Sequence, residues 1–360
     1  MNNRINALNR QKATAYIIYF LTFGIMMLVG TFRDLEIDKA LFNYQNSFAY
    51  FMEQYGMLPQ NILKLCAYSA LIASYHKVDD ALDIAQSLAP FIARLREVRA
   101  LRAIYFVLHH LIYASFVYSA FIGSNEFLNA LLTPSAGGNL QDILVDAGVS
   151  KAVAIALWTV VRLSLVALAV FLFSRINKDA LKAFELMAIA GIIAYEGIEL
   201  IILLKDIFHR IRFREMIAFS HGLVDENGWT HRGDADIPRE WINDTSFKAF
   251  TRWYKIGADY GVYSEPTSFP SGHTAAGSFV MLLPLLAGKF KNAEKWFLPS
   301  FAISFAYLLT LGITRLIRGA HYMTDVASAA IIMFTLMLII TAVLNSIERY
   351  SQKRLRKNND

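Results

Sequence analysis

The sequence predicts an all-α fold, a polytopic membrane bundle of about eight transmembrane helices. Its 360 residues are 56% hydrophobic and 18% charged, whereas a soluble domain carries about 25% charged residues. The apolar residues come in runs of roughly 17 to 25, long enough to cross the hydrocarbon core as helices. Basic residues gather between these runs, as they do in the short cytoplasmic loops of membrane proteins.

The first span is expected at 13–31, directly after the basic segment 1–12. A signal peptide is the alternative, but the apolar run is long for one and no small-residue cleavage pattern follows. We therefore expect a retained span with a cytoplasmic N-terminus. The mixed, aromatic-rich segment 33–56 is expected at the outer interface.

The second span, at 58–75, is the weakest, because Asn61 and Lys64 interrupt it. The next segment, 77–99, repeats apolar residues at helical spacing and ends in arginines. It is predicted to be an amphipathic helix on the inner membrane surface, or alternatively a linker helix packed on the bundle. Together these elements form a predicted N-terminal membrane region, 1–101.

A membrane core is predicted at 102–345, with the stretches of candidate chemistry in its C-terminal half, and a basic cytoplasmic tail at 346–360. A long polar segment, 205–270, separates the fifth and sixth spans. The six remaining spans are expected at 103–123, 152–173, 183–204, 271–287, 296–313 and 322–344.

Charge sets the predicted orientation, because basic residues select the cytoplasmic side of short loops. With eight spans, all the basic segments and both termini fall on that side. The acidic loop 124–150 and the polar segment 205–270 fall on the other. The net charge of +6 thus concerns membrane orientation and predicts no nucleic-acid partner. Cys66 is the single cysteine, so no intrachain disulfide or cysteine metal cluster is possible.

The first stretch with candidate chemistry is 268–274. Pro270 suits the first turn of a helix, which would place Ser271, Gly272 and His273 there as well. Free backbone N–H groups and the helix dipole would bind an anion, and His273 could act as an acid. The alternative is a turn that caps a span, with His273 at the membrane interface.

The second stretch is 315–325. Gly319 permits a tight reversal between the last two spans, so Arg315 ends one helix and His321 starts the next. Asp325 lies on the same helical face as His321 and is expected to accept a hydrogen bond from the imidazole. That bond would leave the other ring nitrogen as a nucleophile. An interfacial surface pair is the alternative.

The third stretch begins at Lys205. Arg212 follows seven residues later, two helical turns on, so both side chains are expected on one face at the end of the fifth span. Snorkelling anchors are the alternative interpretation. Other ionisable side chains crowd this stretch: His209, Arg210 and Arg214.

Taken together, Lys-x6-Arg at 205–212, Pro-Ser-Gly-His at 270–273 and Arg-x5-His-x3-Asp at 315–325 resemble the three-part signature of the type 2 phosphatidic acid phosphatase superfamily. These membrane lipid phosphatases share their site design with the vanadium haloperoxidases. The resemblance covers about a third of the chain. Two positions depart from the family pattern. Phe213 stands where the family usually has proline, and Thr314 stands where it usually has serine.

The resemblance implies a role for each residue. His321 would attack phosphorus and form a phosphohistidine, Asp325 would orient it, and His273 would protonate the leaving oxygen and then activate water. The implied phosphate-binding residues are Lys205, Arg212, Ser271, Gly272 and Arg315. Side-chain cations would stabilise the phosphoryl charge in place of a metal, so no metal and no cofactor are expected.

The implied function is a lipid phosphatase in the cell membrane, with a membrane lipid phosphate as its partner. Phosphatidate, phosphatidylglycerol phosphate and a polyprenyl diphosphate such as undecaprenyl diphosphate all fit, and we place the polyprenyl diphosphate first. Phosphoryl transfer to another lipid is an alternative within the family.

A non-enzymatic transporter or lipid-binding protein is the contrasting class. Arg162, Glu196 and Glu199 lie inside apolar spans, where charge is expensive and usually paired. We expect an Arg162–glutamate ion pair, with a proton or ion path as the alternative. Aromatic residues of the outer segment would either rest on lipid or form a packed cap: Trp229, Trp241, Trp253 and Tyr254.

Overall fold

The computed structural model describes residues 2–77, 99–133, 140–225, 228–229, 237–256 and 267–359. These residues are almost entirely helical, and the only strands among them form one antiparallel pair of two-residue strands. The all-α class is therefore confirmed. The amphipathic helix predicted at 77–99 lies outside the described residues apart from its two end positions.

In chain order the elements are α1 (Asn2–Leu41), α2 (Ser47–Tyr55), α3 (Leu58–Lys77), α6 (Arg99–Leu132), α7 (Leu140–Asp146), α8 (Lys151–Arg175), α9 (Lys178–Tyr195), α10 (Gly197–Phe208), α11 (Phe213–Ser220), β1 (Val224–Asp225), β2 (Gly228–Trp229), the 3-10 helix η1 (Arg239–Asp244), α12 (Gly272–Gly277), the 3-10 helix η2 (Ser278–Met281), α13 (Leu282–Ala287), α14 (Ala293–Ile317) and α15 (Met323–Asn359).

Five helices in the described part of the chain are long and apolar enough to cross a membrane: Arg4–Leu41, Lys151–Arg175, Lys178–Phe208, Ala293–Ile317 and Met323–Tyr350. Large apolar side chains stay exposed along them, such as Leu28, Val160 and Ile303. Contiguous exposed apolar surface of this kind marks contact with lipid or a partner. The chain is a membrane protein, but the predicted count of eight spans is not confirmed.

The second and third predicted spans lie in α3 and α6, which are not among those five helices. The sixth, 271–287, is broken into α12, η2 and α13. One continuous α-helix over 271–287 would rise about 26 Å, less than the roughly 30 Å of the hydrocarbon core.

The contacts divide the chain into two compact units. Unit 1 joins Met1–Pro59 to Glu196–Thr335, and unit 2 joins Gln60–Tyr195 to Leu336–Asp360. Every residue predicted for the catalytic or phosphate-binding site belongs to unit 1. The sequence-based division follows chain order instead and stays a prediction: 1–101, 102–345 and 346–360.

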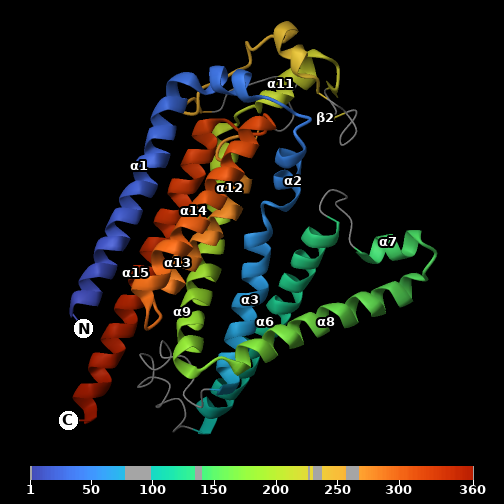
Figure 1. Cartoon of the computed structure of the whole chain (residues 1–360). Coiled ribbons are helices and arrows are strands. Elements are labelled where there is room, and N and C mark those ends of the chain that lie inside the picture. Colours follow the sequence, from blue (N-terminus) through green and yellow to red (C-terminus); the bar gives the residue numbers. More distant parts are fainter. Residues whose placement is uncertain are drawn as a thin grey trace. The chain divides into compact units, whose positions relative to one another are not determined.

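Helices α1, α14 and the first half of α15 lie side by side in unit 1 (Figure 1). The fully buried Tyr19 of α1 donates a hydrogen bond to the Ala330 carbonyl of α15 at 2.9 Å. Helix α1 continues ten residues beyond the predicted end of its span at residue 31. This extension carries Asp34 and Asp38, both buried, into the interior of unit 1.

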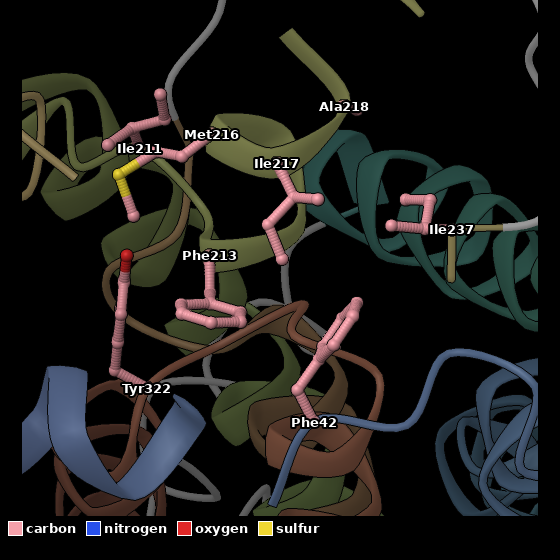
Figure 2. Packing of buried hydrophobic residues seen from close by; sticks show 8 residues of the cluster. All are labelled: Phe42, Ile211, Phe213, Met216, Ile217, Ala218, Ile237 and Tyr322. Carbon is pink, nitrogen blue, oxygen red and sulfur yellow. The ribbon is translucent and has the colours of Figure 1, made fainter. Parts of the chain in front are cut away.

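Figure 2 shows a buried hydrophobic cluster of unit 1, and its members are Phe42, Ile211, Phe213, Met216, Ile217, Ala218, Ile237 and Tyr322. Phe213 packs edge-on against Phe42 and stacks on Phe247, with ring centroids 5.3 Å apart in both cases. Gly319, at φ +59°, reverses the chain beside them, and a Cβ there would lie 2.8 Å from the Phe42 ring. Only glycine combines this φ with this close approach.

Unit 2 contains α3, α6, α7, α8 and α9. Lys64 forms an ion pair with Glu126 at 2.7 Å. Arg162 donates to the Phe121 carbonyl at 2.8 Å and covers the Phe121 ring at 3.5 Å. Because Glu196 belongs to the other unit, the predicted pairing of Arg162 with a glutamate stays a prediction.

The aromatic residues of the outer segment favour the packed cap where they are described. Trp241 stacks on His221 with centroids 4.2 Å apart. Trp253 donates to the Thr31 hydroxyl at 3.0 Å and stacks on Phe269. Tyr254 is 47% exposed. The Trp229 side chain lies outside the described part of the structure.

Candidate active site

Lys205 and Arg212 meet at one residue, not on one helical face. Helix α10 ends at Phe208, and His209 adopts the left-handed conformation with φ 46°. The chain therefore leaves the helix between the two cations, and the predicted shared face is wrong. Instead, Lys205 Nζ donates to the Thr267 carbonyl, and Arg212 Nη2 donates to the Thr267 hydroxyl at 3.0 Å.

Arg212 is fixed by the start of α11. Its backbone N–H donates to Glu215 Oε2 at 3.1 Å, and its Nη1 donates to Glu215 Oε1 at 3.2 Å. This is a capping-box arrangement. Phe213 follows as the first helical residue and is fully buried. The capping of Arg212 and the burial of Phe213 thus hold the Arg212 backbone in place, although Phe213 replaces the proline that the family usually has.

The Pro-Ser-Gly-His stretch begins α12 one residue later than expected. Pro270 precedes the helix, and Ser271 is the N-cap, whose hydroxyl accepts from the Thr274 N–H at 3.2 Å. The first-turn position predicted for Pro270 and Ser271 is therefore wrong. A Cβ at Gly272 would lie 3.6 Å from Lys205 Cε, so the Gly272 backbone adjoins this lysine.

His321 has a defined tautomer. Its Nδ1 lies 2.7 Å from the Ser268 carbonyl oxygen, and a carbonyl only accepts hydrogen bonds. Nδ1 therefore carries the proton, and Nε2 keeps its lone pair. Asp325 Oδ2 lies 3.7 Å from Nδ1, too far for a hydrogen bond. The expected Asp325 acceptor is thus replaced by the Ser268 carbonyl.

The pKa of His321 is lowered to about 3, and burial is the largest cause. Lys205 and Arg212 also lower this pKa, whereas Asp325 raises it. His321 is 3% exposed, so water does little to stabilise a charged form. His321 is therefore neutral at physiological pH, which is the form a nucleophile requires.

Asp325 acts on His321 through Ser268. Its Oδ2 accepts from the Ser268 hydroxyl and from the Tyr322 N–H, the latter at 2.9 Å. Its Oδ1 accepts from Arg210 Nη1 at 2.6 Å. Ser268 thus joins the two side chains, because its hydroxyl donates to the Asp325 carboxylate and its carbonyl accepts from the His321 imidazole.

Arg210 is a site residue that the sequence did not single out. It is 1% exposed, and all three guanidinium nitrogens donate. Nε donates to the Thr251 carbonyl at 3.0 Å, Nη1 also donates to the Thr324 hydroxyl at 2.8 Å, and Nη2 donates to Asp34 Oδ2 at 2.9 Å. Burial lowers the pKa of Arg210, but Asp325 and Asp34 outweigh burial and raise it above its usual range.

Glu53 of α2 is the second unpredicted site residue. Its Oε1 accepts from Arg315 Nη2 at 2.6 Å and from Arg214 Nη1 at 2.8 Å, and its Oε2 accepts from Arg318 Nε at 2.7 Å. Its backbone carbonyl accepts from His273 Nε2 at 3.2 Å. Burial raises the pKa of Glu53, but the three guanidiniums outweigh burial and hold it well below its usual range.

Arg315 has hydrogen-bond donors that no protein group accepts in the described structure. It is 1% exposed, yet its Nε and Nη1 have no hydrogen-bond partner in the described structure. Buried N–H groups of a cation are costly to leave unpaired. Either donor, together with the second hydrogen of Nη2, suits an anion such as phosphate, which a guanidinium grips through two parallel bonds.

The predicted residues gather around His321. His273 lies close enough to Arg315 and His321 to interact with both electrostatically, and His321 interacts in the same way with Lys205 and Arg212. In the part of the chain that is described, no group of three or more His, Cys, Asp or Glu side chains could hold a metal ion. That the reaction needs no metal stays a prediction.

The family model described as the PAP2 superfamily matches residues 179–349. This match contains all three motifs and confirms the resemblance drawn from them. No curated protein and no solved structure matches the chain significantly. Glu53 and Asp34 lie outside the matched residues.

Proposed function

We propose that this chain, a member of the PAP2 superfamily over residues 179–349, is an integral membrane lipid phosphatase that works through a phosphohistidine. One observation carries the proposal. His321 is buried and neutral, and the Ser268 carbonyl holds its Nδ1–H, so Nε2 is an oriented nucleophile. A transporter or lipid-binding protein has no need of such a group.

In the first step, the Nε2 lone pair of His321 forms a bond to phosphorus. The bond between phosphorus and the leaving oxygen breaks, and its electron pair stays on that oxygen. His273 takes up a proton at Nδ1 from solvent when the anionic substrate binds beside it, and it then supplies this proton to the oxygen. Because His273 Nε2 donates to the Glu53 carbonyl, Nδ1 is the nitrogen left for this transfer.

In the second step, His273 Nδ1 takes a proton from water. The water oxygen bonds to phosphorus, the bond from phosphorus to His321 Nε2 breaks, and its electron pair returns to the ring. The products are inorganic phosphate and the original neutral imidazole.

The phosphoryl oxygens carry the charge that must be stabilised during transfer. Lys205, Arg212 and Arg315 supply cations for them, with Ser271 and Gly272 as further contacts. Positioned donors of this kind account for about 10²- to 10³-fold in rate each. These cations take the place that a metal holds in other phosphatases, so hydrolysis is expected to survive chelators.

The proposed substrate has its apolar tail in the bilayer and its head group at the membrane surface. A polyprenyl diphosphate is our first choice, followed by phosphatidylglycerol phosphate and phosphatidate. The proposed orientation has both termini in the cytoplasm and the site on the outer face of the cell membrane, and the basic segments between the spans support it. Labelling of single introduced cysteines in intact cells, in a Cys66→Ser background, tests this orientation.

The test is phosphate release by detergent-purified protein with excess chelator. The panel holds the three lipids above and a soluble phosphomonoester, each with a His321→Ala control. We expect chelator-resistant release from at least one lipid that the variant loses. Phosphate moved to an added lipid alcohol would assign transfer instead. Release that His321→Ala keeps, or no reaction in any arm, would overturn the proposal.

A further inference from the structure

We infer that Glu53 positions Arg315 and sets the net charge of the phosphate site. The inference rests on the proposed function. It adds to the PAP2 domain a residue from the N-terminal part of the chain, because Glu53 lies outside the matched residues 179–349.

The first support is that α2, the helix of Glu53, is fixed against α14, the helix of Arg315. The Asn46 side chain caps α2 by accepting from the Ala49 N–H at 2.8 Å. At the other end of α2, the Gly56 carbonyl accepts from the Tyr307 hydroxyl of α14 at 3.0 Å. Helix α2 thus packs on α14, which holds the backbone of Glu53 in place while its side chain contacts Arg315.

The second support is that Glu53 leaves room for phosphate on Arg315. The carboxylate takes only Nη2, at 2.6 Å. The Nε and Nη1 donors stay without partners, and Nη2 has a second hydrogen, so one edge of the guanidinium, Nη2 with either Nε or Nη1, stays open. Arg315 can therefore hold Glu53 and a phosphoryl group at the same time, so Glu53 orients the guanidinium without displacing the substrate.

The third support is charge. Arg214, Arg315 and Arg318 surround a single carboxylate, which leaves this cluster with a net charge of +2. A phosphate monoester carries about −1.5 to −2 near neutral pH. Without the carboxylate the cluster would carry +3. It would then hold inorganic phosphate more tightly, and Arg315 would lose the acceptor that fixes it.

The experiment compares wild type with Glu53→Gln, Arg318→Gln and the double variant. Each is assayed for kcat on the best lipid substrate, for inhibition by inorganic phosphate, and for phosphate binding by calorimetry. Arg318 is the partner to remove because its loss restores the net charge of +2 in the double variant. The matched control is Glu126→Gln, which breaks an ion pair in the other unit.

For Glu53→Gln we expect kcat to fall about 10-fold and phosphate to bind about 10-fold tighter, because a nearby unit charge is worth at least that much in a partly buried site. The double variant should return phosphate affinity toward wild type. Glu126→Gln should change neither quantity. A purely structural role would instead weaken phosphate binding along with kcat.

Unchanged kcat and phosphate affinity in Glu53→Gln, or weaker phosphate binding, would overturn the inference while leaving the proposed phosphatase intact. If wild type hydrolyses no lipid, the proposed function fails, and the calorimetric comparison still decides the role of Glu53. If Glu53→Gln does not fold, Arg318→Gln serves alone. It should then bind phosphate more weakly than wild type, and unchanged binding would overturn the inference.

Discussion

Two buried groups of arginines and carboxylates flank the candidate nucleophile, and they differ in how completely they are paired. The Asp325 network consists of Arg210, Asp325, Asp34 and Thr324, and all three nitrogens of its arginine have acceptors. The Glu53 cluster consists of Glu53, Arg214, Arg315 and Arg318, and two nitrogens of Arg315 have none.

The difference in pairing indicates that the Asp325 network supports the structure of the site, whereas the Glu53 cluster binds the phosphate. The Asp325 network has one cation and two carboxylates, so it is closed and negative, and it braces the loop that holds His321. The Glu53 cluster is open and positive, which suits an incoming phosphate. A negative group behind the imidazole and a positive one at the phosphate favour transfer of a phosphoryl group to His321.

The largest expected effect comes from breaking the closed network. Replacing Arg210 by Met removes one partner of a buried ion pair and leaves Asp325 and Asp34 uncompensated, which costs about 3–5 kcal/mol. That is a large share of a typical stability of about 5–15 kcal/mol. Thermal unfolding in detergent should show a much lower midpoint, whereas Arg252→Met, at an exposed position, should show little change. Equal midpoints would mean that the network is no brace.

The open cluster should respond in the opposite way. Arg315→Lys keeps the charge but loses the planar fork that binds two phosphoryl oxygens. We expect kcat to fall about 10²- to 10³-fold, with an unfolding midpoint close to wild type. Arg349→Lys, on the exposed end of α15, is the control. A much lower unfolding midpoint for Arg315→Lys, or a kcat equal to that of wild type, would contradict the distinction between the two groups.

The pH dependence of stability tests the buried neutral His321. Its pKa is about 3 in the folded protein against 6.5 for the free side chain, so the unfolded chain binds a proton that the folded chain does not. Stability is then fully present above pH 6.5 and falls as pH drops toward 3, by about 2 kcal/mol between pH 7 and pH 5. Denaturant unfolding of wild type and His321→Asn at both pH values isolates this loss. The same loss in the variant would assign it to other groups.

The smallest expected effect concerns the meeting point of Lys205 and Arg212. Thr267→Val removes the hydroxyl that accepts from Arg212 and leaves the backbone carbonyl that accepts from Lys205. One hydrogen bond to a charged group is worth about 1.5 kcal/mol, so we expect KM to rise about 10-fold with kcat nearly unchanged. Steady-state kinetics measure both. A fall in kcat with constant KM would instead place Thr267 in the transition state.

The motifs could be predicted because they depend on local spacing. Gly319 had to reverse the chain, and residues 315–325 then follow from where two apolar runs end and begin. The same local reasoning failed at Lys205 and Arg212, because it assumed a continuous helix. His209 in the left-handed conformation ends that helix, and nothing in the spacing of the two cations reports this.

Arg210, Asp34 and Glu53 could not be predicted, because their roles depend on contacts between distant segments. Asp34 is 176 positions from Arg210, and Glu53 is 262 from Arg315. The only local hint was four acidic residues in a segment expected at the membrane interface. Likewise, the sequence suggested Asp325 as the acceptor for His321 from their i, i+4 spacing, but the Ser268 carbonyl lies closer to Nδ1.

The most direct test of the account is to find the phosphoryl group on His321. Wild type and His273→Ala would each be mixed with the best lipid substrate for a single turnover, quenched in base, digested and read by mass spectrometry. We expect phosphorylated His321 to accumulate in His273→Ala, because this variant cannot activate water for the second step. The substrate for this variant needs a leaving group that requires no proton, so that the first step still occurs. Phosphate release without any label on His321, or a label on another residue, would contradict the mechanism.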